Sequence, residues 1–170
     1  THSSMPRPDN AIFTLSKAMA RIADYDTPPK LIESTREFFL TLAKTSSPPL
    51  STYYFNLVNS KDPKLVHQAD VEIAKNPLLH AIMRNTIAPV FLNAGFRGNV
   101  IPGSAQATLN FRTIPGTDPR ELVSEIQAVV NDPRVAVSLP PANTPEGARM
   151  AEYVRMGARS KPSTTDTVLY

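Results

Sequence analysis

The chain opens with apolar residues spaced along one face of a helix. Between residues 9 and 24 they recur every three or four positions, at Ile12, Leu15, Met19 and Ile22. This spacing is typical of an amphipathic helix whose apolar stripe packs on a core.

The next region, residues 28–84, is divided by prolines into short apolar-periodic pieces. Ser34 and Glu37 match a Ser-x-x-Glu capping box at the start of a second helix. The pieces between Ser46 and Arg84 are typical of a small helical cluster. The region is therefore expected to form a helical insert, with its aromatic residues in packing roles.

Two later segments have strand patterns. Residues 86–92 are rich in β-formers but contain Pro89, which cannot donate a ladder hydrogen bond, so this strand is expected to lie at a sheet edge or to be locally irregular. Residues 105–114 alternate, with Leu109 and Phe111 on one face and polar side chains on the other. This second strand should have one face on a core and one in solvent.

Residues 118–130 carry clear helix signals, with Asp118 suited to the N-cap and Pro119 to the first turn. Alternation over residues 135–139 then predicts a closing strand. Residues 140–147, rich in proline and small residues, are typical of a linker. Near the chain end, possible N-cap residues precede Val168, Leu169 and Tyr170 and predict the start of a helix: Ser163, Thr164 and Asp166.

The order of these elements predicts an α+β fold. One more strand before Thr1 would complete βαββαβ, a ferredoxin-like antiparallel sheet with helices on one face and an insert at about 28–84. The given sequence lacks that strand, so either it lies upstream or another segment completes the sheet. Residues 1–139 would form this domain, and residues 140–170 a linker and a returning segment.

Composition excludes several classes of protein. Eighteen Lys and Arg face fifteen Asp and Glu, and the basic residues are too scattered to follow a phosphate backbone. No apolar run approaches the length needed to cross a bilayer. The absence of cysteine excludes disulfides, thiolate nucleophiles and cysteine-ligated zinc, but leaves the compartment open, cytoplasmic or exported.

Three short motifs are specific by their order and spacing along the chain: His2-Ser3-Ser4-Met5-Pro6, Asn99-Val100-Ile101-Pro102, and Asn110-Phe111-Arg112 followed by Pro115-Gly116. Together they resemble the lid and dimerisation domain of the co-catalytic zinc peptidases, which include carboxypeptidase S, Gly-Xaa carboxypeptidase, glutamate carboxypeptidase, aminoacylase and succinyl-diaminopimelate desuccinylase. The insert and the run Arg84-Asn85-Thr86 most resemble the carboxypeptidase S branch. Thr1 stands where the family usually has Gly.

The resemblance implies that the chain is cut from a homodimeric hydrolase, without the catalytic domain that would hold two zinc ions. The chain itself would bind no metal. His2 would reach the partner subunit's active site and hold the carbonyl oxygen of the tetrahedral intermediate. Arg112 and Asn99 would grip the free carboxylate of a short peptide or an N-acyl amino acid.

Each of these residues also has a plainer interpretation. His2 could be a surface residue near a chain end, and Arg112 a solvated strand arginine in a surface ion pair. Asn99 also suits a turn beside Gly98. Asp70 and Glu72, near His67, are better explained as a solvated helix face than as metal ligands beside that histidine.

Two other classes of protein share the predicted topology. A stand-alone ferredoxin-like module would bind a small ligand at its dimer interface, and chain ends that fall inside motifs argue against it. An RNA-binding domain should show exposed aromatic residues and a basic-Gly-aromatic signature, and the strand around Phe111 has neither.

Overall fold

The computed structural model describes residues 2–155 and 166–169. The chain forms two compact units, one of residues 1–26 with 87–170 and one of Thr27–Thr86. None of the helices in the described ranges has the length and apolar character needed to span a bilayer.

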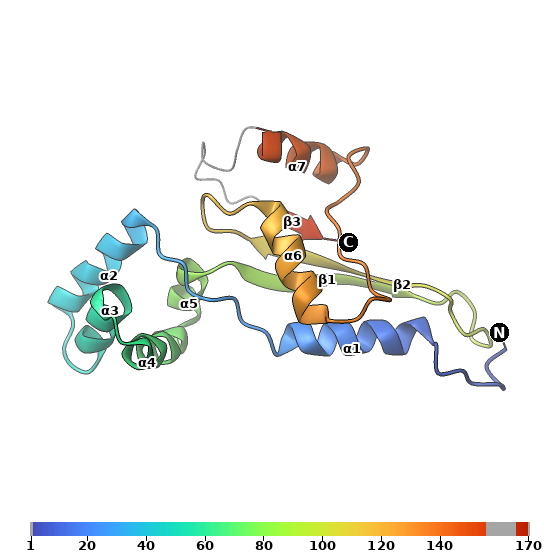
Figure 1. The fold of residues 1–170 in the computed structure, drawn as a ribbon, viewed down its shortest axis with the longest axis horizontal. Coiled ribbons are helices and arrows are strands. Elements are labelled where there is room, and N and C mark those ends of the chain that lie inside the picture. The colour runs from blue at the N-terminus through green and yellow to red at the C-terminus, as the bar shows by residue number, and fades with distance from the viewer. Residues whose placement is uncertain (1, 156–165, 170) are drawn as a thin grey trace. The chain divides into compact units, whose positions relative to one another are not determined.

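The first unit contains two helices that the sequence predicts well, α1 (Ala11–Ala23) and α6 (Pro119–Val130) (Figure 1). Asn10 caps α1 by accepting a hydrogen bond from the Ile12 amide, and Asp118 caps α6 by accepting one from the Arg120 amide. Helix α6 ends as local rules require, since Asn131 adopts the left-handed conformation that stops it, with φ of 45°. The two helix predictions are confirmed.

The sheet of this unit has the strand order β1-β2-β3, with β1 at Thr86–Ala94, β2 at Ala105–Arg112 and β3 at Asp166–Leu169. Strand β3 is antiparallel to β2, from the pair Leu109 and Leu169 to the pair Arg112 and Asp166. Strand β1 therefore lies at a sheet edge, as its proline predicts. The predicted α+β class is confirmed, and so are the strands predicted at residues 86–92 and 105–114.

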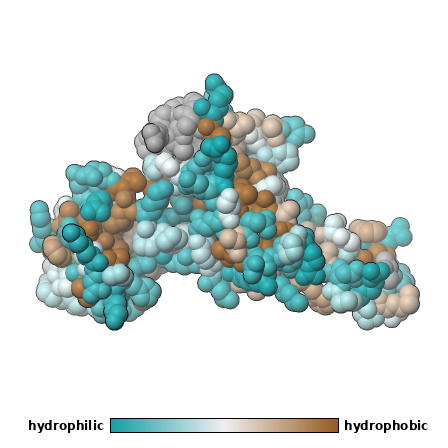
Figure 2. Space-filling model, viewed as in Figure 1, coloured by the Kyte–Doolittle hydropathy of each residue, from teal (hydrophilic) through white to brown (hydrophobic). Residues whose placement is uncertain are grey.

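The core lies between β2 and the two helices. Its buried members come from α1, β2 and α6: Ala18, Ile22, Leu109, Phe111, Leu122, Ile126 and Val130. The polar outer side of α1 is visible as teal surface in Figure 2, as its amphipathic pattern predicts. On the other face of β2, Thr108 is buried and Asn110 is half-buried, so the expectation of a fully solvated face is wrong there.

A polar contact joins the helices at the edge of this core. The Tyr25 hydroxyl, at the end of α1, donates a hydrogen bond to the Glu125 carboxylate of α6. Burial and the neighbouring carboxylate raise the pKa of Tyr25 to about 12, so the phenol keeps its proton at neutral pH.

The predicted closing strand at residues 135–139 is not a strand in the structure. Val135, Val137 and Leu139 do pack on the core, as their alternation predicts. The Gln127 side chain donates to the Val135 carbonyl at 2.9 Å and accepts from the Val137 amide at 2.9 Å. A side-chain amide thus takes the place of a neighbouring strand, which is why an extended segment forms no ladder.

The end of the chain also differs from the prediction. Helix α7 (Pro145–Arg155) begins inside the expected linker, and a Cβ on Gly147 would lie 1.9 Å from the Pro141 carbonyl oxygen, so only glycine fits this close approach. Asp166 to Leu169 form strand β3 where a helix start was expected. Ser163, Thr164 and Tyr170 lie outside the described residues.

The second unit is a helical cluster over Thr27–Thr86, close to the range expected for the insert. Its helices are α2 (Glu33–Thr45), α3 (Leu50–Asn59), α4 (Pro63–Ala74) and α5 (Pro77–Met83). Helix α2 does not use the predicted Ser34–Glu37 capping box. Instead, the Thr35 hydroxyl accepts a hydrogen bond from the Ile32 amide at 2.9 Å.

Aromatic and aliphatic side chains fill the centre of this second unit. Phe39 and Tyr54 are buried there beside Ile73 and Met83, with the rings of Phe39 and Tyr54 5.9 Å apart. Phe38 is partly exposed, but its ring packs edge-on against Phe39 with the ring centroids 5.4 Å apart, whereas Phe55 is exposed. Brown surface is visible on this unit in Figure 2. The predicted packing role is confirmed for Phe39, Tyr54 and Phe38, and it is wrong for Phe55.

A buried ion pair closes the second unit. Arg84, at the end of α5, is 3% exposed and forms an ion pair and hydrogen bond with Asp70 of α4. Its guanidinium also donates to the Thr27 carbonyl at 2.9 Å, which ties the first residue of the unit to its last helix. Sequence analysis placed Asp70 on a solvated face, and the structure corrects this.

Candidate functional site

His2 lies beside the turn that leads into β2. It forms an isolated antiparallel bridge with Val100, and the Ser3 amide donates to the Asn99 carbonyl at 3.0 Å. In Figure 1 the N-terminus and this turn lie together at the end of the unit where β2 begins. The fold thus brings together two of the three predicted site residues, although they are 97 positions apart in the printed sequence.

The His2 ring is exposed and is held by its own turn. Its Nδ1 atom lies 2.8 Å from the Ser4 hydroxyl oxygen and accepts a hydrogen bond from the Ser4 amide at 3.2 Å. The Met5 amide closes the turn by donating to the His2 carbonyl at 3.1 Å. Sequence analysis assigned no role to Ser4, although its position two residues after a candidate histidine is the signal for such a contact.

Asn99 lies in a turn, as the plainer interpretation of its sequence predicts. Its backbone belongs to a turn in which the Val100 amide donates to the Arg97 carbonyl at 3.3 Å. Its side chain is exposed and makes no hydrogen bond within the described part of the chain. A turn position that also presents an amide beside His2 leaves that amide available to a ligand.

Arg112 lies at the other end of β2. It is exposed, on the strand face opposite Leu109 and Phe111, and its Cα partner is Asp166. Because a strand rises about 3.3 Å per residue, the length of β2 from Ala105 to Arg112 is roughly 23 Å. The structure therefore separates Arg112 from His2 and Asn99 within one chain.

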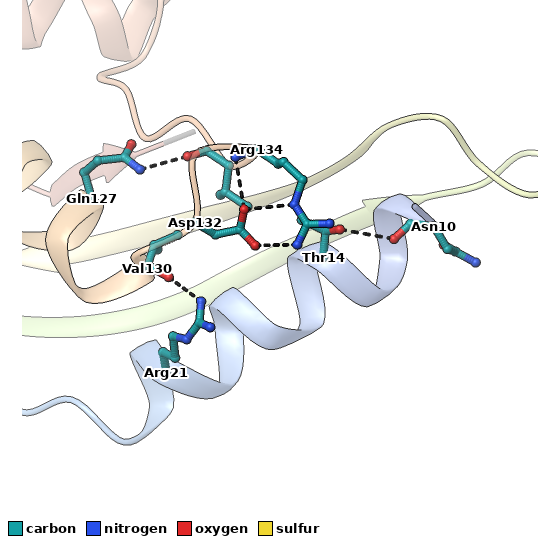
Figure 3. Close-up of polar contacts among 8 residues, drawn as sticks. Asn10, Thr14, Arg21, Gln127, Val130, Asp132 and Arg134 are labelled. Carbon is teal, nitrogen blue, oxygen red and sulfur yellow. Dashed lines mark hydrogen bonds and ion pairs between the residues drawn. The ribbon is translucent and has the colours of Figure 1, made fainter. Parts of the chain in front are cut away.

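A charged cluster lies where α6 meets the segment that follows it (Figure 3). The Arg134 guanidinium binds the Asp132 carboxylate in a bidentate pair, with the shorter contact at 2.7 Å, and this lowers the pKa of Asp132 well below its usual value. Arg21 of α1 donates to the Val130 carbonyl and so satisfies the C-terminal end of α6. These contacts fasten α1, α6 and residues 132–135 together and have a structural role.

A cavity of about 440 Å³ lies between α1, the first half of β2 and residues 134–137. Its floor is apolar and includes Ala18, Ile22 and Leu109, while Asp9 and Arg134 are the charged residues of its lining. The cavity separates the first residues of β2 from the extended segment that was expected to close the sheet.

No group of three or more His, Asp or Glu side chains that could hold a metal ion occurs among the residues that the structure describes. His67 is exposed on α4, and its neighbours have other partners, since Asp70 binds Arg84 and Glu72 binds Lys75. His67 and its described neighbours therefore do not form a donor set for zinc.

Comparison with known proteins places these residues in a known kind of domain. The family described as the peptidase dimerisation domain, M20, matches residues 1–137. That range includes His2, Asn99 and Arg112.

Individual relatives agree with that match. Probable carboxypeptidase S-like 2 of Dictyostelium discoideum is 35% identical over 137 residues, which are 81% of this chain and 25% of the relative. Human N-fatty-acyl-amino acid synthase/hydrolase PM20D1 is 31% identical over 134 residues, 79% of this chain and 26% of the relative. The mouse protein of the same name is 32% identical over 139 residues, which are 79% of this chain and 26% of the relative.

The chain therefore spans about a quarter of the length of the curated relatives it matches. No solved structure matches it at a significant level.

Proposed function

The chain belongs to the M20 peptidase dimerisation domain family, and on this premise we propose that it is the dimerisation and substrate-capping domain of a longer, homodimeric hydrolase. That enzyme would cleave amide bonds next to a free carboxylate, in short peptides or N-acyl amino acids. The match over residues 1–137 carries the proposal. The names of the relatives support the substrate class, since they denote a carboxypeptidase and fatty-acyl amino acid hydrolases. A stand-alone module is not favoured, because the relatives are about four times longer than the matched segment.

Zinc would belong to the catalytic domain of that longer protein and would supply the activated water there. The described residues of this chain contain no donor set for it. What the chain contributes is therefore limited to binding, orienting and hydrogen bonding, and His2, Asn99 and Arg112 are the residues proposed for those tasks.

We propose that two copies pair along β1. The strand lies at a sheet edge, and apolar side chains on both of its faces are exposed: Val90 at 48%, Phe91 at 73% and Leu92 at 69%. An exposed apolar edge strand is a template for pairing with another chain. A second copy satisfies it by two-fold symmetry, because the same edge then meets itself.

Phe91→Asp tests this dimer. The change places a charge on the pairing surface, and the variant is expected to shift from dimer to monomer in light scattering coupled to gel filtration. Phe55→Asp is the matched control, because Phe55 is 53% exposed on α3 in the other unit and should leave the dimer intact. A Phe91→Asp protein that remains dimeric at micromolar concentration contradicts pairing along β1.

His2 is proposed to donate a hydrogen bond to the carbonyl oxygen as it gains negative charge during amide cleavage. Because the His2 ring is exposed beside a turn, it can reach a substrate bound by another subunit. A hydrogen-bond donor aimed at a developing oxyanion is worth roughly 3 to 4 kcal/mol. Asn99 lies on the same turn and would bind the same substrate.

Arg112 is proposed to bind the substrate carboxylate, for which its planar fork is suited. It lies roughly 23 Å away along β2, too far for His2 of the same chain to reach the same scissile bond. Each chain would therefore serve two active sites, with His2 and Asn99 at one and Arg112 at the other. In a two-fold dimer this gives each site a complete set drawn from both subunits.

The position of the strand that is missing from the predicted ferredoxin-like sheet can also be proposed. A ferredoxin-like βαββαβ sheet requires a strand between β2 and residues 135–139. The cavity of about 440 Å³ lies between these two segments and has an apolar floor. We place the additional strand of the longer protein there, where it would pair with residues 105–108, which lie outside the β3 register.

A further inference from the structure

We propose that Ser4 is a positioning residue that fixes the tautomer of His2. It would hold the imidazole with its proton on Nε2, the nitrogen that faces away from the turn. The inference rests on the proposed role of His2 as a hydrogen-bond donor to substrate, and it names the residue that prepares His2 for that role.

The Ser4 backbone amide determines which nitrogen carries the proton. It points at Nδ1 at 3.2 Å, and an amide N–H can only donate. Nδ1 must therefore present its lone pair, which places the proton of a neutral imidazole on Nε2. The Ser4 hydroxyl lies 2.8 Å from the same nitrogen and can donate or accept, so it follows the tautomer that the amide sets.

The backbone around His2 keeps Ser4 in place. The turn is closed by the Met5 amide on the His2 carbonyl at 3.1 Å, and it is anchored by the Ser3 amide on the Asn99 carbonyl at 3.0 Å. The bridge between His2 and Val100 adds a second anchor. The contact is therefore built into a hydrogen-bonded loop.

This arrangement suits an oxyanion contact. No hydrogen bond reaches Nε2 from any residue that the structure describes, so its N–H is available to a ligand. The opposite tautomer would present a lone pair at Nε2, which repels a developing negative charge. By selecting the tautomer in advance, Ser4 removes a rearrangement that the reaction would otherwise require.

The tautomer can be measured directly in the longer protein that contains this chain. The protein is labelled with ¹⁵N-histidine, and the ring ¹⁵N shifts of His2 are recorded at about pH 8, where imidazoles are mostly neutral. The His2 signals are assigned by their loss in His2→Gln. In the wild type, Nδ1 is expected to show the shift of an unprotonated nitrogen.

Ser4→Pro removes the amide donor, so the ratio of the two tautomers should move roughly three- to tenfold toward Nδ1–H, the effect of one ordinary hydrogen bond. Ser4→Ala keeps the amide and should change the ratio much less, and Ser3→Ala, in the same turn, should leave it unchanged. An unchanged ratio in Ser4→Pro, or a wild type that favours Nδ1–H, overturns the inference.

Kinetics of the longer enzyme separate this inference from the proposed function. Ser4→Pro should lower kcat by about the same three- to tenfold with little change in KM, and Ser3→Ala should not. If His2→Ala leaves kcat unchanged while the tautomer still responds to Ser4, the catalytic role of His2 fails and the positioning by Ser4 stands. If the tautomer does not respond to Ser4, the positioning fails whatever His2→Ala does.

Discussion

His2→Ala in the longer enzyme is expected to lower kcat by about two to three orders of magnitude with little change in KM. The reason is that a donor aimed at a developing oxyanion acts in the transition state and hardly at all in the bound substrate. Steady-state hydrolysis of an N-acyl amino acid measures both constants.

His67→Ala is the matched control for this variant. His67 is also exposed, but it lies on α4 in the other unit and has no proposed part in the reaction. It should keep wild-type kinetics. A His2→Ala enzyme with kcat within a factor of three of wild type contradicts the oxyanion role.

Asp70→Ala is expected to destabilise the helical unit by about 3 to 5 kcal/mol, because it leaves the buried Arg84 guanidinium without its carboxylate. Arg84 is 3% exposed, so water cannot replace the lost partner. Since the chain has two units, the loss is best measured by native-state hydrogen exchange of amides in α3 and α4, which reports the opening of this unit alone.

Two further variants make this test specific to the buried pair. Glu72→Ala, on the same helix, removes a surface ion pair with Lys75 and should cost less than about 1 kcal/mol. Asp70→Ala combined with Arg84→Met removes both charges and should recover part of the loss. Equal effects of Asp70→Ala and Glu72→Ala would refute the importance of burial.

Helices set by local signals were predictable from sequence. For α6, Asp118 and Pro119 lie in the first turn and the apolar stripe follows at helical spacing, so neither its start nor its buried face depends on distant residues. The same holds for α1. The second helix shows the limit of this reasoning, since Ser34 and Glu37 match a capping box but Thr35 makes the contact.

Strand assignments failed where a strand depends on its partner. Residues 135–139 have the right alternation, and they pack on the core, but their backbone groups at Val135 and Val137 bond to the Gln127 side chain. Residues 166–169 look like a helix start locally and become a strand because β2 offers an edge there. Pairing is non-local, so periodicity alone does not settle it.

The site was predictable only in part, because its geometry also depends on contacts between distant parts of the chain. Motifs indicated His2, Asn99 and Arg112, and their chemistry follows from residue type. Their spacing in the fold does not, because the bridge between His2 and Val100 joins distant parts of the chain while β2 carries Arg112 away. The role of Ser4 required atomic distances.

Each chain is proposed to serve two active sites, and mixing inactive subunits is the most direct experiment on this arrangement. His2→Ala and Arg112→Ala versions of the longer enzyme are each expected to be poorly active. In a heterodimer of the two, one site has both defects and the other has none. Equal mixing followed by subunit exchange gives half mixed dimers, so activity should return to about a quarter of wild type.

Mixing His2→Ala with Asn99→Ala subunits is the control, because these residues lie on one turn and would serve the same site. Every site in that mixture keeps one defect, and activity should not return. Activity is therefore expected to recover in the mixture of His2 and Arg112 variants and not in the mixture of His2 and Asn99 variants. No recovery in the first mixture, with subunit exchange verified, would contradict this arrangement.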